Sequence, residues 1–284
     1  MAKLLSGGEV SAAIIRDCAA RRAELRAKGI RPALAIVRCG ARPDDLSYEK
    51  GIERSAAGLD IDIRKFLLPE PPGRQLLSAV IDKINLDRDI HGCLIFRPLP
   101  GMAPEEQEQL CSALAPEKDV DCCTAVSAAG VFTGRALGFP PCTAQACIEL
   151  LKHYGTRLRG KQAVVIGRSL VVGRPAAMLM LAEDATVTLC HSRSRDLADI
   201  CRRADIIVSA AGRPGLISRD FVRPGQVLLD VSMNWDGSGF VGDAVYDEVE
   251  PVVSAITPVP GGIGAVTTAV LMKHLILAAE RSGC

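Results

Sequence analysis

One stretch near the middle of the chain constrains the fold more than any other. The apolar run of residues 163–166 is followed by Gly167 and Gly173, by Pro175, and by a segment rich in Ala, Met and Leu. This order predicts a strand, a tight turn and a helix. Free N–H groups at a helix start attract phosphate, so such a turn favours a nucleotide. The spacing differs from G-x-G-x-x-G, and on this stretch alone an ordinary strand-to-helix turn is an equal alternative.

Strand-like and helix-like patterns alternate along the whole chain, which favours parallel α/β sheets. The 284 residues suit two domains. We expect an α/β fold in which residues 1–140 form one domain, joined by a closing apolar helix within residues 265–284. Residues 141–264 then form a doubly wound, Rossmann-like domain, with a cleft between the two. Residues 116–138 lack periodicity and predict a long ordered loop, a kind of segment that tends to be functional.

The overall composition excludes several classes of partner. The net charge is +1 and no basic stripe with interleaved aromatics is present, so we expect no nucleic-acid partner. The 11 cysteines are scattered without a C-x-x-C pair. We therefore expect no metal site and reduced thiols in a cytoplasmic protein, with a reactive Cys122–Cys123 pair as the alternative. No apolar run reaches the length of a membrane span, so no membrane partner is expected.

The end of the next predicted strand indicates which nucleotide is bound. NAD enzymes place a carboxylate there for the ribose hydroxyls, but this chain has Ser192 and Arg193. Arg and Ser suit a 2′-phosphate, and Arg168 in the first turn adds a second cation. NADP is therefore favoured over NAD, with a solvated basic face as the alternative. The small residues Ala211 and Gly212, after the third strand, allow a ligand to approach the backbone closely.

Short motifs follow one another in a fixed order along the chain. They are Ser47-Tyr48, Pro98-Leu99-Pro100, Lys118-Asp119-Val120-Asp121, Pro141-Cys142-Thr143, residues 165–169 with 172–175, Val241-Gly242-Asp243-Ala244, and residues 256–264 with the sequence ITPVPGGIG. In these motifs and in their order, the chain resembles the bifunctional methylenetetrahydrofolate dehydrogenase/cyclohydrolase family over essentially its full length.

The resemblance implies a two-domain homodimer that acts on tetrahydrofolate derivatives. Enzymes of this family oxidise 5,10-methylenetetrahydrofolate with NADP to the methenyl form and then add water to give 10-formyltetrahydrofolate. A role in one-carbon metabolism and purine biosynthesis follows from these reactions.

The resemblance also assigns roles to residues. Tyr48 would stack on the folate beside the reacting carbon, and Asp121 would accept two N–H bonds from the pterin, which makes both of them catalytic candidates. Pro100 and Gly262 would complete the folate site. A half-buried tyrosine and a loop-capping aspartate are the structural alternatives. The cofactor would be held by Gly167, Arg168, Ser169, Gly173, Arg174, Pro175, Ser192, Arg193, Ala211, Gly212 and Met233.

The chain departs from the family at a proton-handling pair. The family lysine lies four residues after the tyrosine, where this chain has Ile52, and the glutamine that bonds this lysine is replaced by Phe96. A local realignment would make Lys50 the catalytic lysine, whereas Arg97 is a poor base because a guanidinium keeps its proton. Hydride transfer depends mainly on orientation, but water addition needs proton transfer. We therefore expect a dehydrogenase with weak or absent cyclohydrolase activity.

Two other functions fit parts of the sequence. Another two-domain dehydrogenase of the shikimate type would share the alternation of strands and helices. A folate- or nucleotide-binding protein that has lost catalysis would share the motifs, and the altered helix from Tyr48 to Arg54 keeps this possibility open. Formation of NADPH from methylenetetrahydrofolate and NADP separates the three possibilities.

Overall fold

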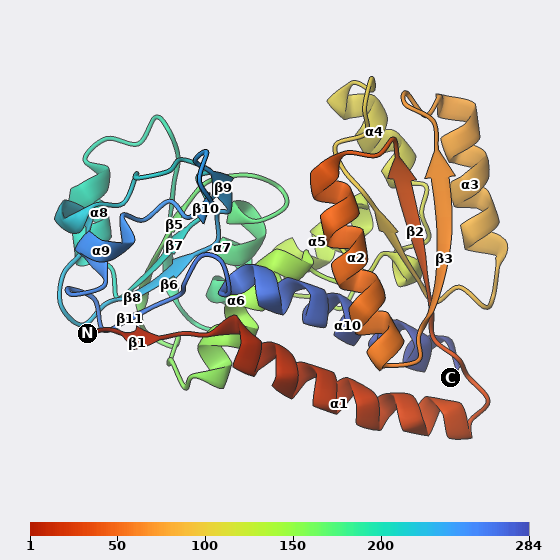
Figure 1. The fold of residues 1–284 in the computed structure, drawn as a ribbon, viewed down its shortest axis with the longest axis horizontal. Helices are drawn as coiled ribbons and strands as arrows, with labels where there is room; N and C mark the ends of the chain where they lie inside the picture. The colour runs from red at the N-terminus through yellow and green to blue at the C-terminus, as the bar shows by residue number, and fades with distance from the viewer. Residues whose placement is uncertain (284) are drawn as a thin grey trace. The chain divides into compact units, whose positions relative to one another are not determined.

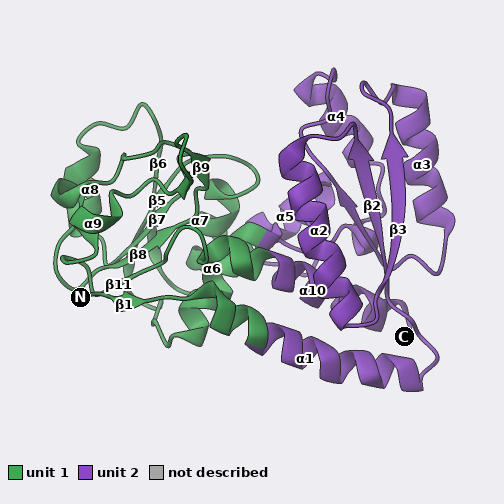
Figure 2. Cartoon of the chain, viewed as in Figure 1, with its two compact units in different colours: residues 1–12, 143–267 green, residues 13–142, 268–284 purple. Residues whose placement is uncertain are grey.

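The computed structural model describes residues 1–283 (Figure 1). The chain forms two compact units, coloured separately in Figure 2: unit 1 contains Met1–Ala12 and Thr143–Thr267, and unit 2 contains Ala13–Cys142 and the chain from Thr268 onward. Residues 1–12 were expected in the first domain. They belong to unit 1 because β1 (Lys3–Leu4) pairs in parallel with β11 (Ala255–Ile256).

Unit 1 is built on a six-stranded sheet in the order β1-β11-β8-β7-β5-β6, and all of its strand pairs are parallel. Its other strands are β5 (Gln162–Ile166), β6 (Thr186–Cys190), β7 (Ile206–Ser209) and β8 (Val227–Asp230). Its helices are α6 (Cys142–His153), α7 (Gly173–Ala182), α8 (Leu197–Arg203), η2 (Arg219–Phe221) and α9 (Tyr246–Val249). A hairpin of β9 (Asn234–Trp235) and β10 (Phe240–Val241) follows β8.

The strand order makes unit 1 doubly wound, as expected. The chain goes from β5 to β6 on one side and then returns to β7 on the other side of β5. Ligands of such sheets bind at the carboxyl ends of the strands where the order reverses. One face of the sheet packs Ile166, Ile207 and Leu228 against Cys201 of α8 and Val249 of α9. This core holds the loops after β5 and β7 in place.

Unit 2 is built on a three-stranded sheet in the order β3-β2-β4. The strands are β2 (Ala33–Cys39), β3 (Asp62–Leu68) and β4 (Gly92–Ile95), all parallel. The helices are α2 (Pro43–Gly58), α3 (Arg74–Leu86), α4 (Pro104–Cys111), η1 (Pro116–Lys118) and α5 (Ala125–Thr133). Two further helices, α1 (Gly7–Ala27) and α10 (Ile263–Ser282), have residues in both units.

The central strand β2 is buried along its whole length, and its side chains alternate between two faces. Val37 and Cys39 pack with Leu77 of α3 and Leu110 of α4 in the core on one face. Arg38 points to the other face, where it pairs with a carboxylate of α2. A buried strand with a charged residue therefore fixes α2 by a polar contact as well as by apolar packing.

The expectation of a long loop over residues 116–138 is wrong, because α5 lies within it. The capping signals for this helix are present in the sequence. The Thr124 hydroxyl accepts a hydrogen bond from the Ser127 N–H, and Gly134 ends the helix with φ of 68°.

Helix α10 is long and apolar enough to cross a membrane by length and composition, with a mean hydropathy of 1.4, but 61% of its most apolar 18-residue window is buried inside the protein. This burial is typical of a core helix. Every cysteine among residues 1–283 is free and buried. Cys284, which was also expected to be a reduced thiol, lies outside the described residues.

Candidate active site

A cavity of about 430 Å³ lies in unit 1 at the carboxyl ends of β5, β6 and β7. This is the point where the strand order reverses. Its walls include five of the cofactor residues predicted from the sequence, and several residues that the prediction missed. The lining residues are Ile166, Gly167, Arg168, Ser169, His191, Ser192, Ser194, Leu197, Ala210, Ala211, Arg213 and Leu216.

Two glycines let the turn after β5 close. Gly167 has φ of +119°, and a Cβ there would lie 2.2 Å from the Ala210 carbonyl oxygen of the neighbouring loop. A Cβ on Gly173 would lie 1.9 Å from the Gly167 carbonyl oxygen. No side chain fits at such distances, so the glycines are required by the close approach of backbone to backbone.

The start of α7 does not present all of its N–H groups to a ligand, which corrects the expectation for this turn. The Ser169 hydroxyl oxygen accepts from the N–H groups of Val172 at 3.1 Å and Gly173 at 3.4 Å. The Ser169 carbonyl accepts from Arg174 at 3.1 Å, and Pro175 has no N–H. Ser169 therefore caps the helix, and anion binding depends more on the cavity's side chains.

The charge of the cavity is positive. Arg168, His191 and Arg213 line it, and none of its lining residues is Asp or Glu. Arg213 was missed because its loop was judged only by its small residues. Arg193 is not among the lining residues: its backbone N–H donates to Nδ1 of His191 at 3.2 Å, and its side chain is exposed. Arg168 and Arg213 both line the cavity, and Arg193 as a contact of the 2′-phosphate stays a prediction.

One buried carboxylate, that of Asp243, organises the wall of the cavity. It accepts from the backbone N–H groups of Ala211 at 2.8 Å and Arg213 at 2.7 Å. It also accepts from the hydroxyls of Ser209 at 2.7 Å and Ser232 at 2.8 Å. The loop after β7 and the segment after β8 are thus tied to the same side chain.

Asp230, at the end of β8, supports the same wall. It accepts from the Ala244 N–H at 2.8 Å, and a Cβ on Gly242 would lie 2.0 Å from its carboxylate. The pKa of Asp230 is raised to about 6, mainly by burial and also by the nearby charge of Asp243, while several backbone hydrogen bonds lower it. The Val241–Ala244 motif is therefore a structural motif, which supports the loops that form the cavity wall.

The remaining predicted cofactor residues lie outside the cavity lining. Gly173 and Pro175 are buried in the first turn of α7, and Arg174 is exposed there. The Gly212 N–H donates to the Ser232 hydroxyl at 3.0 Å. Met233 is 61% exposed. Gly173 and Pro175 therefore form part of the turn, and Gly212 forms part of the cavity wall. Arg174 and Met233 stay predictions as ligand contacts.

Two of the predicted folate residues of unit 2, Tyr48 and Asp121, lie near each other. The rings of Tyr48 and Phe96 lie 5.7 Å apart with an interplanar angle of 59°. Burial raises the pKa of the Tyr48 hydroxyl well above its usual range, and the neighbouring Asp121 and Cys142 raise it further. Tyr48 therefore lies near Asp121 and stays protonated at neutral pH.

Asp121 is half-buried, and its Oδ1 accepts from the Cys142 N–H at 2.8 Å. Burial raises the pKa of its carboxyl group, whereas the bonds from Cys142 and the charge of Arg97 lower it. Arg97 thus lies near enough to Asp121 to act on its charge, a neighbour that the sequence did not reveal. Pro100 is half-buried in the loop after β4.

The assignment of Lys50 as a catalytic residue is corrected by the geometry of α2. Ile52, one turn after Tyr48, is 0% exposed, whereas Lys50 is exposed on the opposite side of the helix. Residues two positions apart on a helix do not share a face, and α2 is regular here. The Tyr48 face therefore carries Ile52 and lacks the lysine.

Two residues of the Lys118–Asp121 motif are structural. The Lys118 ammonium donates to the carbonyls of Ile84 at 2.7 Å and Asp87 at 2.7 Å, and so caps the end of α3. Asp119 is fully buried and accepts from the N–H groups of Cys123 at 2.8 Å and Thr124 at 2.9 Å. Both shape the loop that presents Asp121.

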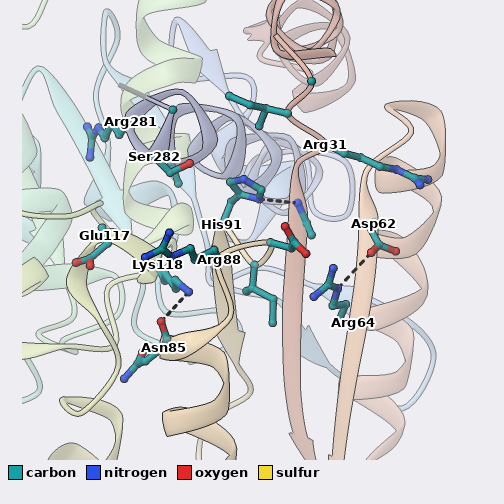
Figure 3. A pocket seen from close by; sticks show the side chains of 17 residues that line it. Arg31, Asp62, Arg64, Asn85, Arg88, His91, Glu117, Lys118, Arg281 and Ser282 are labelled. Atoms are coloured by element: carbon teal, nitrogen blue, oxygen red, sulfur yellow. Dashed lines mark hydrogen bonds and ion pairs between the residues drawn. The ribbon is translucent and has the colours of Figure 1, made fainter. Parts of the chain in front are cut away.

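A second cavity of about 840 Å³ opens in unit 2 near the amino ends of β2 and β3 (Figure 3). Two of its basic residues have structural partners: Arg64 pairs with Asp62 at 3.3 Å, and Lys118 caps α3. His91 accepts from the Ala33 N–H at 3.3 Å. We assign no ligand to this cavity.

Gly262 belongs to unit 1, so its relation to the folate residues of unit 2 stays a prediction. It is buried, and a Cβ there would lie 2.5 Å from the Pro258 carbonyl oxygen. A Cβ on Gly7 would meet the Gly262 carbonyl oxygen at 2.0 Å. Within unit 1, a glycine is thus required at position 262 for the close folding of its own loop, and at position 7 for packing of the start of α1 on that loop.

Comparison with known proteins identifies both parts of the chain. The catalytic domain of tetrahydrofolate dehydrogenase/cyclohydrolase matches residues 5–121, and the NAD(P)-binding domain of the same enzymes matches residues 141–283. The bifunctional protein FolD of Carboxydothermus hydrogenoformans is 49% identical over 283 residues, which are 99% of this chain and 98% of that protein.

Solved structures agree with this match. The bifunctional FolD enzyme of Campylobacter jejuni has a TM-score of 0.95 and 34% identity, with 99% of each chain covered. FolD of Trypanosoma brucei, solved with NADP and an inhibitor, has a TM-score of 0.92 and 35% identity, covering 99% of this chain and 98% of that one. Shikimate dehydrogenases share only the fold, at 13% identity or below.

Proposed function

Because the chain belongs to the tetrahydrofolate dehydrogenase/cyclohydrolase family, we propose that it oxidises 5,10-methylenetetrahydrofolate to 5,10-methenyltetrahydrofolate with NADP. One observation supports this cofactor most directly: the cavity of unit 1 is lined by Arg168 and Arg213 and by no carboxylate. A ribose 2′-phosphate gains charge-assisted hydrogen bonds there, whereas the hydroxyl of NAD does not.

Bound NADP supplies the hydride acceptor, and the residues of the chain orient the two reactants. Arg168 and Ser192 hold the cofactor phosphate, and the close turn at Gly167 lets the cofactor approach the backbone. Asp121 accepts N–H bonds from the pterin, and the protonated Tyr48 lies over the folate. Orientation of this kind is the main requirement of hydride transfer.

We propose that hydrolysis of the methenyl product is weak in this chain, although the relatives are named as bifunctional. The face of α2 that carries Tyr48 continues with the buried Ile52, and the Tyr48 ring meets Phe96. Neither neighbour can accept or donate a proton, and water addition needs such a group.

One experiment tests both steps. Purified protein with methylenetetrahydrofolate and NADP should produce NADPH absorbance, and NAD should be a poor substitute. Given methenyltetrahydrofolate instead, the protein should hydrolyse it little faster than buffer does. Rapid hydrolysis that Lys50→Ala abolishes would contradict the second proposal. Folate binding without any NADPH formation would favour a non-catalytic binding protein.

We further propose a homodimer formed through unit 1. Strand β6 lies at an edge of the sheet, and Leu189 on it and Leu181 on α7 are 38% and 54% exposed. Exposed leucines beside an unpaired strand edge favour pairing with a second copy. Light scattering should give a dimer mass for the parent protein and a monomer mass for Leu189→Lys. We also propose a cytoplasmic location and a role in purine biosynthesis.

A further inference from the structure

Helix α2 carries Tyr48, and it begins with Pro43 but without a side-chain hydrogen bond at its N-cap. Arg42 occupies the N-cap position and makes no side-chain capping bond there. Its guanidinium instead pairs with Asp45 in the first turn, at 2.8 Å. The setting of α2 against the sheet must therefore come from contacts made further along the helix.

Glu49, the residue after Tyr48, makes such contacts. Its Oε2 lies 2.7 Å from Nε of Arg38 on β2, and its Oε1 lies 2.8 Å from Nζ of Lys65 on β3. The side chains of Arg38 and Glu49 are only 7% and 6% exposed. One carboxylate thus joins α2 to two adjacent strands of the sheet.

Arg38 also holds the segment that leads into the helix. Its guanidinium donates to the carbonyl oxygen of Gly40, just before α2, as well as to Glu49. Lys65 pairs with Glu53 one turn further along α2. The chain from Gly40 to Glu49, which contains Tyr48, is therefore held at its beginning by the bond from Arg38 to Gly40 and at its end by the ion pairs of Glu49.

The ion pairs specify the position of α2 more closely than its apolar contacts do. The other buried residues on this helix are Ile52 and Ala56, whose contacts are not directional. A buried ion pair loses much of its energy when either partner shifts, because an unpaired buried charge is costly. Burial raises the pKa of Glu49, but the hydrogen bonds from Lys65 and Arg38 outweigh it and keep the group ionised.

We propose that Glu49, paired with Arg38 and Lys65, is a positioning residue that sets the Tyr48 ring for the folate. This inference rests on the proposed function, in which Tyr48 contacts that substrate. Adjacent helical residues project about 100° apart, so rotation of α2 that moves Glu49 moves the Tyr48 ring with it. The Phe96 ring, 5.7 Å from that of Tyr48, defines the position that the pairing maintains.

The test uses binding of tetrahydrofolate measured by calorimetry, together with the KM for methylenetetrahydrofolate. Glu49→Gln should raise the Kd for tetrahydrofolate and the KM for methylenetetrahydrofolate by about tenfold each, because the Tyr48 ring is no longer held in the binding position. The Kd for NADP, followed by the fluorescence of the single tryptophan, Trp235, should stay within about twofold. Arg38→Met should act like Glu49→Gln, and Arg38→Lys should restore part of the affinity.

Glu53→Gln is the matched control. It removes the same type of charge from the same helix and breaks a contact to the same lysine, but Glu53 is 39% exposed. Folate affinity should stay within about twofold of the parent value. A thermal melt of each variant shows that it is folded at the assay temperature.

A double-mutant cycle separates positioning from general destabilisation. If Glu49 acts through Tyr48, adding Glu49→Gln to Tyr48→Ala should not weaken folate binding further. Additive losses, or a folded Glu49→Gln protein with unchanged affinity, would overturn the inference. Folate binding by the parent protein without turnover would contradict the proposed dehydrogenase activity, but the double-mutant cycle on folate binding would still test the role of Glu49. Absence of folate binding by the parent protein would overturn both proposals.

Discussion

The loops around Gly167 and the surface of α2 around Tyr48 are organised in different ways. In the first region, backbone meets backbone: the sites of Cβ atoms on Gly167 and Gly173 lie about 2 Å from carbonyl oxygens. In the second region, long side chains meet across different elements, with Arg38, Glu49 and Lys65 on two strands and a helix. The first kind of site can be recognised in the sequence from its glycines, whereas the second cannot.

The reason lies in which residues each arrangement allows. A close backbone approach admits only glycine, so the need for it is visible as a glycine at a definite position. An ion pair needs two residues brought together by the topology, and Glu49 and Lys65 look like ordinary surface residues until the fold is known. Cofactor sites built on turns are therefore easier to find from a sequence than substrate sites built on helix faces.

The largest effect is expected from Gly173→Ala. The added methyl group collides with the Gly167 carbonyl oxygen, so the turn must open, and the free energy of unfolding should fall by about 3 kcal/mol. NADP affinity should fall more than about 100-fold, as measured by titration of Trp235 fluorescence. Gly58→Ala is the control, since no atom outside its own helix backbone and chain neighbours lies within 4 Å of its Cβ site. Equal behaviour of the two variants would remove the backbone argument.

The next effect concerns pH and Asp230. Its folded pKa is about 6 against an ordinary value of 3.8, so the proton is bound more tightly in the folded protein. The resulting stability is complete below about pH 4 and is lost as pH rises through about 6, a change of about 3 kcal/mol.

Asp230→Asn removes this titration. The thermal midpoint of the variant relative to the parent should therefore rise by roughly 6 °C between pH 4 and pH 7. Calorimetric melts at several pH values measure the difference. Parallel curves for the two proteins would show that Asp230 titrates normally.

A smaller effect is expected from Arg168→Gln, which changes a side chain of the cavity and leaves the turn intact. Loss of a charge-assisted bond to the 2′-phosphate should weaken NADP binding by about 10- to 100-fold, whereas NAD binding should change less than about threefold. Arg195→Gln, an exposed cation on the next loop, is the control. An equal loss for both cofactors would assign Arg168 to another part of the ligand.

The smallest effect is expected from Lys50→Ala. Lys50 is exposed on the side of α2 away from Tyr48, so the dehydrogenase kcat/KM should stay within about twofold. Steady-state kinetics with methylenetetrahydrofolate measures this. A tenfold loss would return Lys50 to the active site and contradict the geometry of the helix.

Much of the fold was predictable from local patterns. The α/β alternation, the doubly wound sheet and the turn at Gly167 follow from apolar periodicity and glycine positions. The placement of residues 1–12 in unit 1 was not predictable, because β1 is only two residues long and pairs with a strand near the other end of the chain. Helix α5 was missed although its capping residues, Thr124 and Gly134, were visible.

The candidate site divides in the same way. Gly167, Arg168, Ser169, Ser192 and Ala211 were found by pattern and line the cavity. Arg213 and His191 reach it from loops whose meeting point depends on the strand order, which no local pattern gives. Lys50 was misplaced, since its direction depends on how α2 packs in the fold, and Arg193 stays a prediction.

The anchoring of two loops on Asp243 has a consequence for how this cavity can evolve. The carboxylate fixes the backbone of Ala211 and Arg213 and the hydroxyls of Ser209 and Ser232. An insertion in either loop would break this template, so loop length should drift little among related chains. Arg213 is anchored through its backbone, which leaves its side chain open to exchange. Selection can therefore change cofactor preference at this position while the scaffold stays intact.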